Sequence, residues 1–345
     1  MVSGKVFPVM SIVIVNYNGL RHLRKCIPSI LKSNYPFYEI IIVDNGSSDG
    51  SVEFIRKEFE KQLSQIVILP QHNNSGFAVG NNIGASKARG KYILMLNSDT
   101  EVDPNCLGEL VSAMERDESI GAAQAKILFM SQRDTFDTAG GFLNVIGFST
   151  ACGYKKKDIG QYDYVFNISY AKGAAMIVRK SVWTNIGGLE SLFSYYFEDT
   201  DFCWRVWLSG YRVVIIPSAK VFHIGGGTTL KFGLNIDFRK NIEFQDNRNR
   251  IIMVVKNLEL TNLALYIPWL LAMYAYYILH YFRRHDSTAV LGVLRGIFWC
   301  LRFFKVVWSR RLVAQSMRVV SDQQLFKKGV ISRAIMFSHS FQLEP

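Results

Sequence analysis

Four apolar runs in the first third of the chain each lead into a polar segment rich in Asn, Asp, Ser and Gly. The runs are residues 11–15, 39–43, 65–69 and 91–96, and the segments are NYNG, DNGSSDG, NNSG and NSD. Carboxylates and side-chain amides can bind a divalent cation or exchange hydrogen bonds with a ligand. A turn at a strand end explains any one segment. Four such segments together indicate a ligand site.

The spacing of the apolar runs predicts the elements that position these segments. Stretches with apolar residues at helical spacing, 19–32 and 51–63, alternate with the runs, which predicts a mostly parallel sheet with helices on both faces. The carboxyl ends of parallel strands meet at one edge, where open sheets bind ligands. Further strands are predicted at 122–129, 174–178 and 212–216, and residues 130–170 are predicted as long loops over one edge.

The polar segments favour a nucleotide bound without a glycine-rich loop. Neither GxGxxG nor GxxxxGK[ST] follows the first run. Tyr17 can stack on a base, Asp44 can accept from a base N–H or a ribose hydroxyl, and phosphates then need a divalent cation, for which Asp99 is placed. The alternative for Asp99 is to cap the helix predicted at 105–116, but Asp103, before a proline, is the better cap.

Five ordered segments resemble the motifs of the family 2 glycosyltransferases, and they are most similar to the rhamnosyltransferase-like branch that builds cell-surface polysaccharides and lipid-linked glycans. The segments are SIVIVNYNG, VDNGSSDGS, NNSGFAVGNNIG, YILMLNSDT and GGLESLFSYYFEDTDFCWR, within residues 10–250. The resemblance implies a Rossmann-like GT-A fold, a nucleotide-diphosphate sugar donor (UDP-, dTDP- or GDP-linked), a divalent cation and inversion at the anomeric carbon.

The resemblance also implies which residues bind the donor and the cation. Asn97-Ser98-Asp99 resembles the DxD metal motif with Asn97 in place of the first acid, and His223 resembles the family's metal-binding His. A His packed at a strand end is the alternative for His223. Imidazole ligation favours Mn²⁺ over Mg²⁺. The residues expected to bind the nucleotide are Asn16, Tyr17, Asn18, Asp44, Asn81, Asn82 and Ser98.

The segment YFEDTD resembles the family's ED motif, in which the Asp is the catalytic base. Asp199 is therefore the expected base, because displacement at the anomeric carbon needs a carboxylate to accept the acceptor hydroxyl's proton. Glu198 and Asp201 are the alternatives, but Asp201 is expected to pair with Arg205 at i,i+4. The family often reads GGFDE where this chain has GGLES. Gly188, Glu190 and Glu198 are expected near the substrate, and the replacement by Glu190 leaves the donor sugar open.

The carboxyl-terminal third is basic and apolar. From residue 248 onward the chain has 14 Lys or Arg against four Asp or Glu, a net +10 of the total +12. Residues 262–282 carry no Lys, Arg, Asp or Glu and could span a bilayer, although they include Pro268. Residues 291–308 contain three cations and fit a surface helix. We expect a transferase domain over 8–250 and a membrane-associated helical region over 251–345.

The chain is predicted to act at the cytoplasmic face of the cell membrane. The amino terminus does not read as a signal peptide, and five scattered cysteines without a CxxC pair indicate a reducing compartment. A single span would leave the later cations outside, against the positive-inside bias. Helices lying in or dipping into the inner leaflet are therefore expected, and a span or a buried structural helix are the alternatives.

The predicted function is transfer of a sugar to a glycan or polyprenol-linked acceptor. The alternative is a non-catalytic, membrane-associated glycan-binding or scaffold protein on the same fold, but such a protein needs no base. Nucleic-acid binding is disfavoured, because the cations lie among long apolar runs, unlike a solvated groove.

Overall fold

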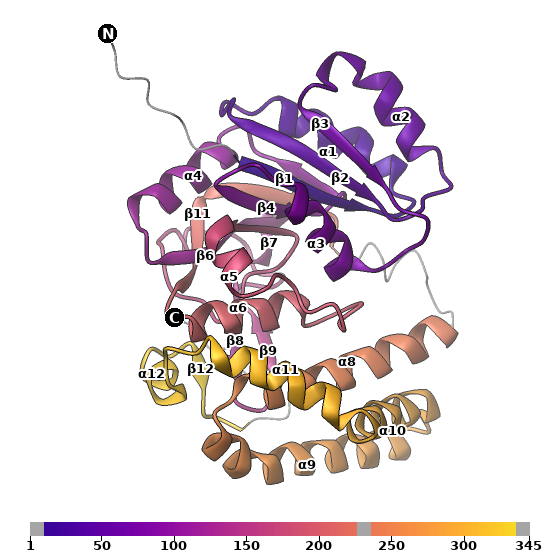
Figure 1. Ribbon diagram of the computed structural model, residues 1–345, viewed down its shortest axis with the longest axis vertical. Coiled ribbons are helices and arrows are strands. Elements are labelled where there is room, and N and C mark those ends of the chain that lie inside the picture. Colours follow the sequence, from indigo (N-terminus) through magenta and orange to yellow (C-terminus); the bar gives the residue numbers. More distant parts are fainter. Residues whose placement is uncertain (1–9, 226–235, 336–345) are drawn as a thin grey trace.

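A mixed nine-stranded sheet forms the centre of the computed structural model, which describes residues 10–225 and 236–335 (Figure 1). Its strands are β1 (Met10–Asn16), β2 (Tyr38–Asp44), β3 (Ile66–Pro70), β4 (Tyr92–Leu96), β5 (Thr100–Val102), β6 (Ile120–Phe129), β7 (Gln132–Thr138), β10 (Ala175–Arg179) and β11 (Arg212–His223). The order is β3-β2-β1-β4-β10-β6-β11-β5, with β7 on β6. Strands β1 to β4 are parallel, whereas β10 runs antiparallel to β4 and β6.

Helices cover both faces of this sheet, as the alternation of runs predicts. They are α1 (Leu20–Leu31), α2 (Ser51–Glu58), α3 (Phe77–Lys87), α4 (Cys106–Arg116), α5 (Lys180–Asn185) and α6 (Glu198–Leu208), with a short 3₁₀ turn η1 (Glu60–Gln62). Alternate residues of a strand face opposite sides. Ile12 and Ile14 of β1 accordingly pack in one core with α1, α2 and α4, while Val13 packs in the other with α3, α5 and α6.

The prediction of long loops over residues 130–170 is wrong for residues 132–151 and holds for 152–170, which contain no helix or strand. This region contains β7 together with β8 (Gly141–Asn144) and β9 (Ser149–Ala151). Strands β8 and β9 form a small second sheet with β12 (Ile331–Ser332), in the order β12-β8-β9. The pairing of β7 with β6 has register shifts, and β8, β9 and β12 are only four, three and two residues long, so these strands leave no clear period in the sequence.

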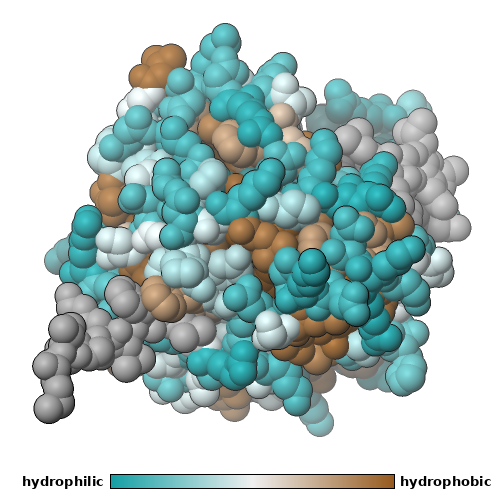
Figure 2. Space-filling model, turned by 90° about the horizontal axis from the view of Figure 1, so that it is seen from above, coloured by the Kyte–Doolittle hydropathy of each residue, from teal (hydrophilic) through white to brown (hydrophobic). Residues whose placement is uncertain are grey.

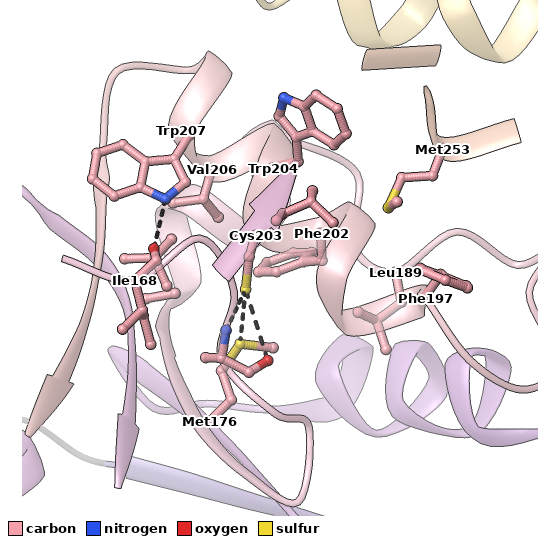
Figure 3. Packing of buried hydrophobic residues seen from close by; sticks show 14 of the residues in the cluster. Ile168, Met176, Leu189, Phe197, Phe202, Cys203, Trp204, Val206, Trp207 and Met253 are labelled. Carbon is pink, nitrogen blue, oxygen red and sulfur yellow. Dashed lines mark hydrogen bonds between the residues drawn. The ribbon is translucent and has the colours of Figure 1, made fainter. Parts of the chain in front are cut away.

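Helix α6 lies deep in the core, which fixes the residues at its start. Figure 3 shows Phe202, Cys203, Trp204 and Trp207 packed among side chains from β10 and α8. Trp207 Nε1 donates to the carbonyl of Ile168 at 3.0 Å. Ten of the eleven α6 residues are buried, so the helix has little freedom to shift.

Five helices follow the sheet: α8 (Ile236–Asn257), α9 (Leu260–Arg283), α10 (Ser287–Arg302), α11 (Phe304–Ser316) and α12 (Asp322–Lys327). In Figure 1, α8 to α11 lie together at the end of the molecule away from α2. Apolar residues of α9 to α12 belong to the same core as α6. The expected domain boundary at 250/251 falls inside α8, which runs through it without a break, and residues 8–9 and 336–345 lie outside the described residues.

Candidate functional site

A cavity of about 180 Å³ opens at the carboxyl ends of β1 and β4. It is lined by Val15, Tyr17, Asn18, Gly19, His22, Asn45, Asn74, Gly76, Phe77, Asn97, Ser98, Asp99 and Tyr195. Four predicted residues therefore line one cavity: Tyr17, Asn18, Ser98 and Asp99. The exposed ring of Tyr17 can stack on a planar ligand. Asn45, His22 and Tyr195 were not predicted, although Asn45 lies in a polar segment that the sequence singles out.

Asn16 and Asp44, at the ends of β1 and β2, do not line this cavity. Asn16 Nδ2 donates to Asp44 Oδ1 at 2.8 Å, and the backbone N–H of Ser47 donates to Asp44 Oδ2 at 3.0 Å. Both residues are buried. In this structure the Asp44 carboxylate closes the turn after β2 and joins it to the end of β1, from which Tyr17 and Asn18 follow.

Asn81 and Asn82 of α3 also lie outside the cavity lining. Asn82 Nδ2 donates to the carbonyl of Leu189 at 2.8 Å, and Asn82 Oδ1 accepts from the N–H of Leu189 at 2.9 Å. Asn81 Nδ2 donates to the carbonyl of Phe77, while its Oδ1 is buried without a hydrogen-bond partner. Asn82 thus ties the Gly188–Leu189 segment to α3.

Asp99 and His223 meet at the sheet edge, as the resemblance implies. Residue 223, at the end of β11, pairs with Thr100 of β5, directly after Asp99. His223 Nε2 lies 3.2 Å from Asp99 Oδ1, and His223 Nδ1 lies 2.6 Å from Asp137 Oδ2. Lys172 Nζ pairs in turn with Asp137 at 2.7 Å. Burial opposes the charge of His223, but its hydrogen bonds to Asp137 and Asp99 raise its pKa above the ordinary value.

This pair fits one divalent cation with a supporting carboxylate. Two ligands of one Mg²⁺ or Mn²⁺, each about 2.1 Å away at right angles, lie about 3 Å apart, close to the Asp99–His223 separation. The Nδ1 contact with Asp137 leaves Nε2 facing Asp99, the arrangement usual for a metal-ligating His. No group of three His, Cys, Asp or Glu side chains within residues 10–225 and 236–335 forms a metal cluster, so the remaining ligands would come from substrate and water.

Burial and hydrogen bonding also set the protonation of Asp99. Burial would raise the pKa of its carboxyl, but the hydrogen bond from His223 and the positive charges nearby outweigh it and lower the pKa. The carboxylate is therefore ionised at neutral pH and able to bind a cation. The expectation that Asp103 caps the following helix is wrong: the N-cap of α4 is Asn105, and Asp103 Oδ1 accepts from the N–H of Asn105 at 3.0 Å in the turn before the helix.

A second cavity of about 530 Å³ adjoins the first. Both are lined by Phe77, Asn97, Asp99 and Tyr195, and the second adds Asp137, Lys172, Glu198, Asp199 and His223, with Tyr154, Tyr170 and Tyr196 among its aromatic residues. Asp199 therefore faces a pocket that meets the first one at Asp99. Tyr17 and the Asp199 carboxylate therefore line different cavities, and Asp99 lines both.

Asp199 and Glu198 share a dry environment at the start of α6. Asp199 Oδ2 accepts from the N–H of Gly173 at 2.9 Å, and Glu198 Oε2 is buried without a hydrogen-bond partner. Burial raises the pKa of Asp199, and burial with the neighbouring charge of Asp199 raises the pKa of Glu198 to about 8. Backbone N–H groups donate to the Asp199 carboxylate and stabilise its ionised form, whereas Glu198 Oε2 accepts no hydrogen bond. Asp199 therefore ionises first, and Glu198 holds the proton.

Asp201 has a structural position, as expected. It has no exposed surface, and its Oδ2 pairs with Arg205 at 2.9 Å and with Lys256 of α8 at 2.8 Å. Asn257 Nδ2 donates to Asp201 Oδ1 at 2.8 Å. The predicted i,i+4 pair with Arg205 is confirmed, and the partners from α8 are additional.

Glu190 and Gly188 belong to the same structural network. Glu190 Oε2 pairs with Lys256 at 3.0 Å, and the carbonyl of Gly188 accepts from Arg205 at 2.8 Å. Neither residue lines the two cavities at Asp99. The expectation that Glu190 and Gly188 lie near the donor sugar therefore has no support in their placement, because Glu190 is turned toward α8.

Residues 11–182 match the profile of Glycosyl transferase family 2, and the chain belongs to this family. It is 27% identical over 224 residues to the O-antigen biosynthesis protein RfbC of Myxococcus xanthus, which covers 63% of this chain and 17% of that protein. The chain spans a quarter or less of the length of its first curated relatives.

Solved structures confirm the GT-A type of fold. The structure of GalNAc-T7 with UDP, GalNAc and Mn²⁺ matches with a TM-score of 0.65 at 15% identity, over 94% of this chain and 56% of that one. The mannosyltransferase PcManGT of Pyrobaculum calidifontis, in complex with GDP-Man and Mn²⁺, matches with a TM-score of 0.55 at 14% identity, over 94% and 89%. At these identities the likeness concerns the fold.

Proposed function

We propose that the protein is an inverting, metal-dependent glycosyltransferase that moves a sugar from a nucleoside diphosphate to a glycan or lipid-linked acceptor. The observation that carries this proposal is the meeting of two cavities at Asp99, with Tyr17 in one and Asp199 in the other. A donor needs a base-binding end and a charged diphosphate, and an acceptor needs a carboxylate beside its hydroxyl. Family membership and the fold of the two Mn²⁺ complexes support the same reaction.

The side chains have separate tasks in this reaction. Tyr17 stacks on the nucleobase, and Asp99 and His223 would hold a divalent cation, which supplies positive charge to the departing diphosphate. Asp199 accepts the proton of the acceptor hydroxyl as that oxygen attacks the anomeric carbon from the opposite side. Asp137 and Lys172 orient His223. The imidazole in the ligand set favours Mn²⁺ over Mg²⁺.

The acceptor end is proposed to work at the cytoplasmic membrane surface. Among the described residues, α9 is the helix long and apolar enough to cross a membrane, and 28% of its most apolar window is buried. Large apolar side chains stand exposed on α9 to α11: Leu265, Trp269, Leu271, Leu279, Phe282, Leu291, Leu294, Phe298, Leu301, Phe304 and Leu312. By contrast, the opposite end of the molecule, where Figure 1 shows α2, is largely hydrophilic when seen from above (Figure 2).

Cations accompany these apolar side chains. Arg283, Arg284, Arg295, Arg302 and Lys305 are exposed on or beside the same helices. Apolar side chains with flanking cations suit the surface of a bilayer that contains anionic lipids. We therefore favour helices lying in the inner leaflet over a single span, because α9 is partly buried: it packs against α10, and its Tyr274 donates to the carbonyl of Asn247 on α8.

Release of free nucleotide from candidate donors tests the proposed transferase. Purified protein is incubated with Mn²⁺ and UDP-, GDP- or dTDP-linked sugars, and the nucleoside diphosphate set free by transfer to water is measured. At least one donor is expected to be turned over by the wild type and not by Asp199→Asn. A donor that binds without any turnover would instead support the non-catalytic binding protein.

A further inference from the structure

Two consecutive residues before α6 have a left-handed backbone that residues with a side chain rarely adopt. Tyr196 has φ 63° and Phe197 has φ 69°. This conformation is unfavourable for a residue with a side chain, so the surrounding contacts must hold it. Phe197 is the N-cap of α6, and Glu198 and Asp199 follow at once. The direction of both carboxylates therefore depends on how this turn is held.

The side chain of Asn249, on α8, hydrogen-bonds to the backbone of this turn. Its Nδ2 donates to the carbonyl of Tyr195 at 2.8 Å and to the carbonyl of Tyr196 at 3.0 Å. Asn249 is fully buried, and its Oδ1 accepts from Arg248 Nε at 3.0 Å, which sets the orientation of the amide. Both N–H donors of one amide are thus used on the two carbonyls that precede Phe197.

We propose that Asn249 is a positioning residue for the catalytic base: it keeps the Tyr196–Phe197 turn in its left-handed conformation and so directs Asp199 into the acceptor cavity. This inference rests on the proposed function. Asn249 does not line either cavity, so it acts on the reaction only through the turn that leads into Asp199. No feature of the sequence near residue 249 points to a role 50 residues earlier in the chain.

Helix α8 provides a firm base for this contact because α10 lies directly against it. A Cβ on Gly292 would lie 2.4 Å from Glu243 Cβ, and a Cβ on Gly296 would lie 3.0 Å from the backbone N of Arg248. Tyr274 of α9 donates to the carbonyl of Asn247 at 3.1 Å. Helices α9 and α10, which are proposed to meet the membrane, therefore help to set the position of α8, the helix that carries Asn249.

The test compares three variants of the full chain. Asn249→Ala removes both donors, and Asn249→Asp keeps the size of the side chain but has no N–H. Asn247→Ala is the matched control, since Asn247 is a buried amide of the same helix whose Nδ2 donates to the carbonyl of Glu243 within α8. For each variant, the release of nucleotide from the donor that the wild type uses is measured beside the calorimetric affinity for that donor with Mn²⁺.

Misplacement of a catalytic group by about 1 Å lowers turnover by about 10²-fold. We expect Asn249→Ala and Asn249→Asp to reduce kcat by about 10- to 100-fold with a donor Kd within about threefold of the wild type. Asn247→Ala should keep kcat within about twofold of the wild type, even if its melting temperature falls as much as that of the Asn249 variants.

Two results would overturn the inference alone. One is normal turnover in a folded Asn249 variant; the other is a loss of donor affinity in step with the loss of turnover, which would indicate general damage to the site. If the wild type neither binds nor turns over any nucleotide sugar with Mn²⁺, the proposed function fails, and the assignment of Asn249 fails with it.

Discussion

Exchanging Asp201 for Asn should destabilise the protein without removing the catalytic base. The Asp201 carboxylate is fully buried between Arg205 and Lys256. Removing one partner of a buried ion pair costs about 3–5 kcal/mol because the remaining charge is left uncompensated. Lys256 keeps Glu190 at 3.0 Å, and Arg205 keeps the carbonyl of Ile186 at 2.6 Å. We therefore expect the lower end of that range, about 3 kcal/mol.

Asp199→Asn should have the opposite pattern. Burial raises the pKa of Asp199, which means that the folded protein disfavours its ionised form. A neutral amide of the same shape removes that penalty, but its NH₂ group must face one of the two backbone N–H groups, of Gly173 and Thr200, that donate to the carboxylate oxygens. The two effects oppose each other, so the free energy of unfolding should change little. Turnover should fall by about 10²- to 10⁴-fold, because the proton acceptor is gone.

The comparison uses urea unfolding and donor turnover on the same preparations of both variants. The assignment predicts a stable, inactive Asp199→Asn and a destabilised Asp201→Asn that remains active at a temperature where it is folded. If Asp199→Asn turns over donor normally while Asp201→Asn is folded and inactive, the two carboxylates have been given the wrong roles.

Two further predictions concern Glu198 and the exposed helices. The pKa of Glu198 in the folded protein is about 8, against an ordinary 4.5, so between these pH values the folded protein holds a proton that the unfolded chain has lost, and stability falls as pH rises. The melting temperature of Glu198→Gln relative to wild type should therefore increase from pH 5 to pH 8. A difference that stays constant with pH would refute the protonation assigned to Glu198. Wild-type protein should float with vesicles that contain phosphatidylglycerol, and salt should not release it. The double variant Phe298→Glu with Leu301→Glu, on α10, should abolish flotation, whereas the control Ile159→Glu, at an exposed apolar side chain far from α10 in sequence, should not. Unchanged flotation of the double variant would refute the proposed membrane surface.

Local sequence pattern was enough to predict the strands that carry the site. The apolar runs at 11–15, 39–43 and 91–96 lie within β1, β2 and β4 or overlap them closely. Tyr17, Ser98 and Asp99, which follow predicted strands, line one cavity because the parallel register brings those strand ends to one edge.

The residues that pattern could not find are those paired over long distances. Asp137 lies in the region predicted as loops and meets His223 only because β7 and β11 both pair with β6. Lys256 and Asn249 reach α6 and its preceding turn from α8. No local spacing in the chain predicts contacts across 50 or more residues, and these contacts decide that Glu190 and Asp201 are structural.

The central claim is that Asp99 binds a nucleoside diphosphate through a divalent cation, and calorimetric titration of UDP, GDP and dTDP tests it most directly. With Mn²⁺, at least one of the three should bind wild-type protein and the control Asp103→Ala. Binding should weaken by at least about tenfold in excess EDTA and in Asp99→Ala. A tenfold loss of affinity corresponds to about 1.4 kcal/mol of binding free energy contributed by the cation. Binding that is equally tight in EDTA, or absent for all three nucleotides, would contradict the account.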